Sequence, residues 1–176
     1  MISRKSADTL RLRFGESDID HLASQYDGKN SRHVENVVAP RIQQQRFLKK
    51  RDLILLAKWK SRRIVSRCRE NSPAFIKAVT GTSFSTTDER LRVEVLRLLH
   101  GVAWPMASVI LHFRFDNTYP ILDFRALWSL GIEERNKYDF ELWWAYVLCC
   151  RKLARRAGVS MRTLDRALWQ YSKENQ

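Results

Sequence analysis

Apolar residues recur along most of the chain at the three- and four-residue spacings of an α-helix. In one such run, from Met106 to Phe113, apolar positions fall at i, i+3, i+4 and i+7, which is one face of a helix. A run of helical spacing precedes it and contains Leu91, Val95, Leu98 and Leu99. Apolar and polar residues nowhere alternate over enough positions for a sheet. The pattern therefore predicts an all-α fold.

Capping residues predict where several of these helices begin and end. Ser72 is an N-cap residue followed by a proline, and Gly81 is expected to end that helix. Thr86–Glu89 resembles a capping box for the helix that carries Leu91. Gly101 then breaks this helix, which predicts a tight turn between two helices.

Apolar residues show a weak helical pattern near the N-terminus and a clear one near the C-terminus. Residues 2–45 are polar and weakly patterned, with helix candidates on either side of a loop at residues 26–30. A helix is expected near residues 138–157, ending at Gly158, and Ser160 is expected to cap a last helix.

Charge is concentrated in one part of the chain. The 176 residues include 32 Lys and Arg against 19 Asp and Glu, which gives a net charge of +13. Residues 46–69 contain ten basic residues and one acid, a net charge of +9, whereas residues 101–150 have a net charge of −2. Apolar positions between the basic residues predict one or two helices there. A local basic face of this size favours an acidic polymer such as nucleic acid as the partner.

Other features narrow the class of protein. The three cysteines, Cys68, Cys149 and Cys150, do not form a disulfide framework, which predicts a reducing cytoplasm. No Cys/His spacing predicts a zinc or iron–sulfur site, so no cofactor is expected. No apolar run approaches the roughly 20 residues of a membrane span, and the first residues lack a signal-peptide core. We therefore expect a soluble, cytoplasmic, monomeric protein without a membrane partner.

Two segments together resemble a known superfamily. "LRLLHGVAWPMA" (96–107) is followed twelve residues later by "YPILD" (119–123). This order and spacing resemble the helix-hairpin-helix DNA glycosylases, especially the adenine-mismatch, endonuclease-III-like branch. The likeness covers residues 50–131. It implies binding of double-stranded DNA, and a fold of two helical lobes. Residues 46–131 would form the lobe with the hairpin, and residues 1–45 would pack with the C-terminal helices of 132–176.

The hairpin supplies the first candidate site. Backbone amides of Gly101, Val102 and Ala103, at the start of a helix, are suited to binding a DNA phosphate without reading sequence. Neighbouring His100 is a further candidate phosphate contact or a surface histidine. An ordinary helix–helix connection explains the same residues. The resemblance also implies a possible monovalent cation at the hairpin carbonyls, whereas Ala103 departs from the second glycine of the family.

Asp123 is the candidate catalytic carboxylate. It fits an N-cap for the helix that follows, and it fits a group that stabilises an oxocarbenium-like sugar or positions water. In the bifunctional relatives, a lysine on the second hairpin helix forms a Schiff base. Here Pro105 occupies that position, which favours a monofunctional enzyme or loss of catalysis. Arg125 is expected to brace Asp123 or to bind the DNA backbone.

The segment "AKWKSRR" (57–63) stands where the family has a helix that faces DNA. Trp59 is a candidate for stacking on a base or filling the gap left by a flipped one, and Arg62 and Arg63 are candidate phosphate contacts. Lys60 also suits a phosphate contact, or a nucleophile if it is desolvated near Asp123. The alternative is a solvated basic face with Trp59 in the core.

These features predict a DNA-binding protein of base excision repair. The expected activity is hydrolysis of the N-glycosidic bond of a damaged or mismatched base. The sequence leaves open whether the chain is an enzyme, because a catalytically inactive accessory protein on the same scaffold fits the residues too. An RNA-binding helical module is a third alternative.

Overall fold

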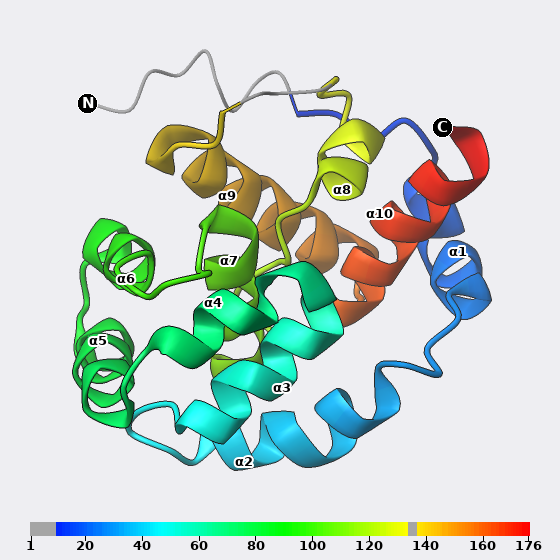
Figure 1. Ribbon diagram of the computed structural model, residues 1–176. Coiled ribbons are helices and arrows are strands. Elements are labelled where there is room, and N and C mark those ends of the chain that lie inside the picture. The colour runs from blue at the N-terminus through cyan, green and yellow to red at the C-terminus, as the bar shows by residue number, and fades with distance from the viewer. Residues whose placement is uncertain (1–9, 134–136) are drawn as a thin grey trace. The chain divides into compact units, whose positions relative to one another are not determined.

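Every regular element in the part of the chain that the structure describes is a helix (Figure 1). The structure, a computed structural model, describes residues 10–133 and 137–176. The all-α class is therefore confirmed. Short η1 (Glu16–Asp18), the π-helical η2 (Val34–Val38) and η3 (Arg62–Ile64) accompany α1 (Ile19–Gln25), α2 (Ala39–Gln43), α3 (Lys50–Lys60), α4 (Val65–Glu70), α5 (Pro73–Ser85), α6 (Glu89–Leu96), α7 (Trp104–Arg114), α8 (Phe124–Ser129), α9 (Phe140–Ala157) and α10 (Met161–Asn175).

The chain forms two compact units. Unit 2 is continuous and spans Gly28–Asp116, whereas unit 1 combines the described residues up to Asp27 with those from Asn117 onward. These boundaries differ from the expected ones at 45 and 131. Residues 34–42 belong to unit 2 because Val38 and Ile42 are fully buried where η2 and α2 pack on α3 and α7. Within unit 1, α1 lies against α10.

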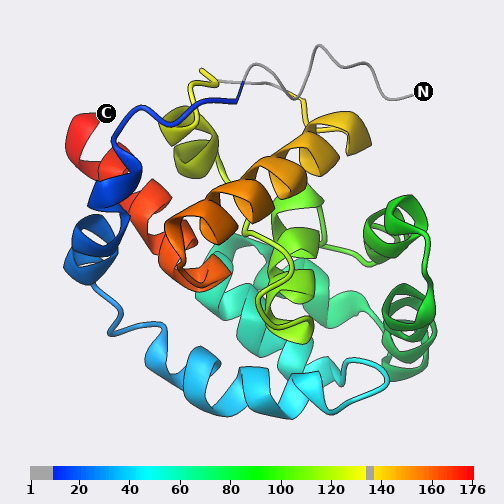
Figure 2. The same cartoon turned by 180° about the vertical axis from the view of Figure 1, so that it is seen from behind.

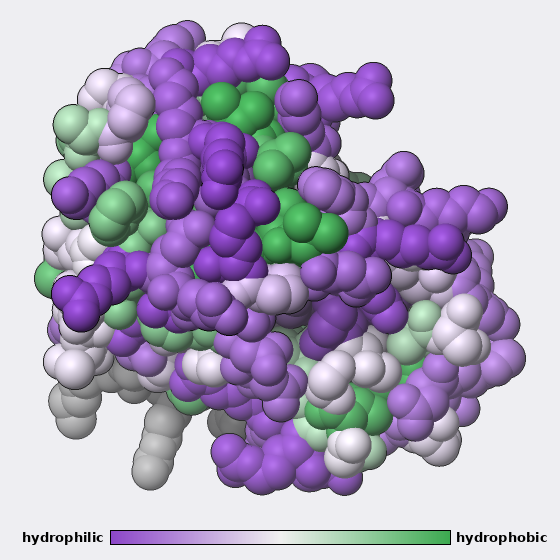
Figure 3. All heavy atoms as spheres, turned by 90° about the horizontal axis from the view of Figure 1, so that it is seen from below, coloured by the Kyte–Doolittle hydropathy of each residue, from purple (hydrophilic) through white to green (hydrophobic). Residues whose placement is uncertain are grey.

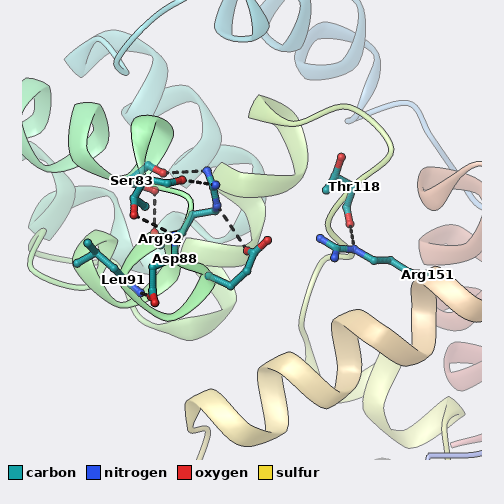
Figure 4. Close-up of polar contacts among 8 residues, drawn as sticks. Ser83, Asp88, Leu91, Arg92, Thr118 and Arg151 are labelled. Carbon is teal, nitrogen blue, oxygen red and sulfur yellow. Dashed lines mark hydrogen bonds and ion pairs between the residues drawn. The ribbon is translucent and has the colours of Figure 1, made fainter.

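Helix α7 is the centre of unit 2. Every residue from Trp104 to Phe113 except Pro105 is buried, and α2, α3 and α6 all pack against it. Helices α5 and α6 lie side by side. Their connection is fixed by Arg92, whose guanidinium donates to the carbonyls of Ser83 (3.1 Å) and Thr86, while the Ser83 hydroxyl donates to the Arg92 carbonyl (Figure 4).

Unit 1 is built around α10, against which α1, α8 and α9 pack. Figure 2 shows α9, the longest helix of the described chain, with α10 following it. The N-terminal segment is joined to the end of α8 because the Arg11 and Arg13 amides donate to the carbonyls of Leu130 and Ser129 (both 2.9 Å). Arg151 of α9 donates to the Thr118 carbonyl at 2.9 Å (Figure 4).

Most predicted helix boundaries are confirmed by cap hydrogen bonds. The Ser72 hydroxyl accepts from the Phe75 amide at the start of α5, and Ser160 accepts from Thr163 at the start of α10. Gly158 ends α9 in the left-handed conformation. The loop after Tyr26 separates α1 from η2, and residues 46–69 contain the two helices α3 and α4 with η3 between them.

Gly81 does not end α5, so that prediction is wrong. The helix continues to Ser85, because Ser83 and Phe84 beyond the glycine are buried in unit 2. Tertiary packing compensates for the roughly 1 kcal/mol by which a glycine disfavours a helix interior.

The predicted start of α6 is also wrong, and its predicted apolar face is wrong in part, because of the four predicted positions only Leu99 is buried. Asp88 rather than Thr86 is the N-cap, since its carboxylate accepts from the Leu91 amide at 2.7 Å. Val93 and Leu96 form the buried face. Leu91 is 46% exposed, and Leu98, which lies beyond the end of the helix, is 61% exposed.

Hydrophilic side chains dominate the face of the molecule seen in Figure 3, with hydrophobic residues in separate patches. Across residues 10–133 and 137–176, no helix combines the length and apolar composition needed to cross a membrane.

Candidate nucleic-acid interface

The hairpin between α6 and α7 is held by a buried amide. Asn71, at the end of α4, accepts from the His100 amide (2.9 Å) and donates to the His100 carbonyl (3.0 Å) and the Cys68 carbonyl (3.1 Å). Asn71 is buried, and its bond to the Cys68 carbonyl is buried too, whereas its two bonds to His100 are part-buried. One side chain thus fixes both backbone groups of His100, the residue before the hairpin glycine.

Gly101 packs directly on the backbone of η3 and α4. Its φ is +80°, a left-handed conformation that glycine adopts without steric cost. A methyl group at this position would lie 2.8 Å from Cys68 Sγ and 3.0 Å from both the Cys68 nitrogen and the Ile64 carbonyl oxygen. The hairpin glycine therefore allows close packing of the turn against the basic segment of the chain.

The start of α7 offers few amides to a phosphate. Ala103 is its exposed, extended N-cap residue, and Pro105 in the first turn has no N–H. Val102 is buried, and its amide donates to the Leu99 carbonyl at 3.0 Å. His100 is exposed, with its Nδ1 3.2 Å from Glu70 Oε2. The predicted phosphate contact therefore depends on the exposed Ala103 and His100 rather than on a full set of helix amides.

The basic segment exposes cations and buries its one acid. Asp52 is fully buried and ion-paired with Arg41 and Arg51. Apart from Glu70 at the end of α4, the exposed charged residues around η3 and α4 are all basic. They are Lys58, Arg62, Arg63, Arg67 and Arg69. Because Gly101 packs on Ile64 and Cys68, the hairpin and this basic surface are adjacent within unit 2.

Trp59 is half-buried within unit 2. Its indole N–H donates to the Ser31 hydroxyl at 3.1 Å, and its ring meets the Phe113 ring edge-on with centroids 5.2 Å apart. These contacts favour the structural alternative for Trp59, and stacking on a base stays a prediction. Lys60 is the last residue of α3 and is half-buried.

Asp123 caps α8 in unit 1, as predicted. Its carboxylate accepts from the Ala126 amide at 2.9 Å, and the side chain is half-buried. Lys60 lies in unit 2, so its role as a nucleophile near Asp123 stays a prediction. Burial, and then the charge of Asp123, raises the pKa of Tyr138.

The extended segment before Asp123 is held by two buried side chains of α9 and α10. The Tyr146 hydroxyl donates to the Ile121 carbonyl (2.9 Å), and the Asp165 carboxylate accepts from the Ile121 amide (3.0 Å). Burial, followed by Cys150, Asp165 and Asp123, raises the pKa of Tyr146 well above its ordinary value. The phenol therefore stays a donor at neutral pH, and both backbone groups of Ile121 are satisfied by side chains.

Arg125 lies over two aromatic rings, and its role as a brace for Asp123 stays a prediction. Its guanidinium lies over the rings of Phe124 (5.1 Å) and Trp169 (5.4 Å), and such cation–π contacts hold the side chain along the surface of unit 1. Binding of Arg125 to the DNA backbone stays a prediction.

Replacing Tyr146 with phenylalanine should destabilise the protein by about 1–3 kcal/mol, because the buried Ile121 carbonyl loses its donor. Urea unfolding of the two proteins measures the difference. Tyr171→Phe is the matched control, since the Tyr171 hydroxyl donates to the more exposed Arg13 carbonyl and water can replace it. An equal loss in both variants would contradict the special role of the buried bond.

Metal-ligating groups and thiols complete the description of the site. Within residues 10–133 and 137–176, no group of three or more His, Cys, Asp or Glu side chains is placed to hold a metal ion. At the hairpin, the carbonyls of Leu99 and His100 each accept a hydrogen bond from the protein. Burial raises the pKa of Cys68 and, more strongly, of Cys150, which disfavours their reactive thiolate forms.

Sequence reasoning missed three residues that position the candidate site: Asn71, Tyr146 and Asp165. Asp165 left a signal, since it falls on the apolar face of α10 between Met161, Leu164 and Leu168, and a carboxylate there must be buried with a partner. Asn71 and Tyr146 left none, because their partners are backbone groups distant in sequence.

Comparisons of the chain with models of known protein families, with curated proteins and with solved structures found no match.

Proposed function

We propose that the protein binds duplex DNA and hydrolyses the N-glycosidic bond of a damaged or mismatched base, on a helix-hairpin-helix glycosylase type of fold. The observation that carries the proposal is the hairpin beside exposed cations in unit 2, followed along the chain by Asp123 in unit 1. The hairpin at Gly101 packs on Ile64 and Cys68, beside the exposed cations Arg62 and Arg63, and the capped carboxylate Asp123 follows in the order typical of the superfamily. Phosphate contacts from such a surface position a protein on DNA without reading its sequence.

In the proposed reaction, water attacks C1′ of the deoxyribose while the bond from C1′ to the base nitrogen breaks. The base leaves with the bonding electrons, and the proton that the attacking water releases balances the one that the base takes up. Asp123 would stabilise the positive charge that develops on the sugar or orient the attacking water. Because Pro105 replaces the hairpin lysine, this position has no amine to form a Schiff base, and we expect base release without strand cleavage.

The second candidate function is a DNA-binding accessory protein without catalysis. It is favoured by the cap bond of Asp123 to the Ala126 amide, because capping α8 explains the carboxylate without catalysis. Cytoplasmic location and a monomeric state remain expectations from the sequence.

Replacing both Arg62 and Arg63 with glutamine should weaken duplex binding by about tenfold at low salt and reduce the salt dependence by about two counterions. Fluorescence anisotropy over a salt series measures both. Arg11→Gln with Lys173→Gln removes the same charge from exposed positions of unit 1 and should change the affinity less. Unchanged affinity in the Arg62 and Arg63 variant would remove this surface from the interface, and stronger competition by RNA than by DNA would favour the RNA-binding alternative.

Duplexes containing uracil, 8-oxoguanine, an alkylated base or a mismatched adenine test the catalytic half. We expect alkali-labile sites in at least one duplex, and no covalent adduct after borohydride treatment. A trapped adduct would contradict the monofunctional mechanism. Binding without any base release would leave the accessory protein as the better proposal.

A further inference from the structure

A cavity of about 510 Å³ opens on unit 2 between α5, the end of α7 and the loop before α3. Aromatic residues, small residues and three basic residues line the cavity. The lining residues that matter here are Arg46, Phe47, Lys77, Gly81, Phe84 and Arg114. A cavity of this size falls within the range of small-molecule sites in proteins.

Two of the three cations lie over aromatic rings. The Lys77 ammonium lies 5.0 Å from the centroid of the Phe47 ring, and the Arg114 guanidinium lies 5.1 Å from that of Phe84. Arg114 also donates from Nη1 to the Gln43 carbonyl at 2.9 Å. The ring contact and the hydrogen bond together restrict Arg114, so it loses less freedom than a free side chain when an anion binds.

Arg114 lacks a full set of partners. Its Nε–H is buried and has no hydrogen-bond acceptor among the described residues. Burial, and then the positive charge of the neighbouring Arg92, lowers the pKa of Arg114. Arg92 is ion-paired with Glu89, at 3.5 Å between Nε and Oε2. A bound anion would supply Arg114 with a hydrogen-bond acceptor and a negative charge.

The charge and the shape of the cavity indicate the kind of occupant. None of the described residues that line it is acidic, so the site complements an anion. A phosphate group alone is small for this volume, and the apolar surface of Phe84, Ala78 and Gly81 remains for an organic group. At Gly81 the cavity is open, since a methyl group there would meet only Phe47 Cβ, at 3.9 Å.

We propose that this cavity binds a phosphate monoester, with the phosphate among Arg46, Lys77 and Arg114 and the organic group against Phe84, Ala78 and Gly81. The ester is either a free metabolite or the 5′-phosphate end of a nucleic-acid strand. The site is independent of Asp123 and of the proposed glycosylase reaction.

Calorimetric titration of the full chain with adenosine 5′-monophosphate tests the site. We expect binding that is about fivefold or more tighter than that of inorganic phosphate, because the organic group contacts apolar surface. Adenosine should bind at least about tenfold more weakly, because it lacks the charge-assisted hydrogen bonds of the phosphate. Equal binding of adenosine and the monophosphate, or of inorganic phosphate and the monophosphate, would overturn the proposal.

Two variants locate the binding. Arg46→Gln with Lys77→Gln changes only exposed side chains and should raise the Kd for the monophosphate by at least about tenfold. Arg11→Gln with Lys173→Gln is the charge-matched control and should leave this Kd unchanged. Gly81→Leu fills the cavity from within helix α5, where leucine is the better helix former. It should abolish monophosphate binding while retaining the melting temperature and the affinity for duplex DNA.

Unchanged monophosphate binding in Gly81→Leu would place the ligand elsewhere and overturn the proposal. Loss of duplex binding in the same variant would overturn the independence of the two sites. Short single strands with a 5′-phosphate or a 5′-hydroxyl then distinguish the sources. Tighter binding of the phosphorylated strand, lost in Gly81→Leu, identifies a strand end, whereas equal binding of both strands identifies a free metabolite.

Discussion

Asp123→Asn should reduce base release from a susceptible duplex by at least about a hundredfold, the scale of loss when one preorganised electrostatic group is removed from an active site. Asparagine caps a helix nearly as well as aspartate, so the bond to the Ala126 amide survives, and stability and DNA affinity should stay close to those of the natural protein. The amide cannot carry the negative charge that stabilises an oxocarbenium ion. Single-turnover assays of alkali-labile sites measure the effect.

A matched control comes from a second aspartate in unit 1 that caps a helix through its side chain. Asp139 caps α9 by accepting from the Leu142 amide at 2.8 Å, so Asp139→Asn repeats the same chemical change in the same kind of position. Base release should persist in this variant. If both variants keep full activity, Asp123 is a cap alone. If both lose it equally, the loss reflects the structure of unit 1 rather than the charge at Asp123.

Gly101→Ala should destabilise the protein by about 2–5 kcal/mol, the sum of left-handed strain and an overpacked contact. The added methyl would meet Cys68 Sγ and two backbone atoms at 3.0 Å or less, and backbone atoms cannot move aside as the end of a flexible side chain can. For a chain of this length, the melting temperature should fall by on the order of 10 °C. Thermal unfolding followed by circular dichroism measures the shift.

Gly158→Ala separates the two causes. Gly158 also has a positive φ, of 68°, but a methyl group there would meet nothing within 4 Å. This variant should therefore lose only about 1–2 kcal/mol, from backbone strain. Equal losses in the two variants would show that the close packing of the hairpin on η3 and α4 contributes nothing.

The helices could be predicted from sequence wherever a local signal decides the boundary. Ser72, Asp123, Ser160 and Gly158 cap helices through groups within a few residues, so their chemistry is visible in the sequence. Gly81 misled because the packing of Ser83 and Phe84, which lie beyond it, extends α5. The face of α6 was mispredicted because its boundaries decide which leucines point inward, and Leu98 falls outside the helix.

The candidate site was predictable in part for the same reason. Asp123 could be found from its place before a helix, and the basic surface from local charge. The clamp of Asn71 on His100 and the bonds of Tyr146 and Asp165 to Ile121 join residues 25 to 44 positions apart, and no local pattern encodes them. Asp52 is likewise buried against Arg41, which lies 11 positions away. Because this acid is buried, the exposed cations of residues 46–69 face less negative charge than the net charge of the segment suggests.

The discontinuity of unit 1 has a consequence for how the chain is made. Unit 2 is one uninterrupted stretch, so all of its contacts are available once Asp116 has emerged from the ribosome. Unit 1 pairs α1 with α10, two helices more than 130 residues apart, and contacts of such sequence separation form slowly. During synthesis the apolar face of α1, with Ile19 and Leu22, therefore stays exposed until α10 has been made. We expect chaperones to shield this face in the meantime.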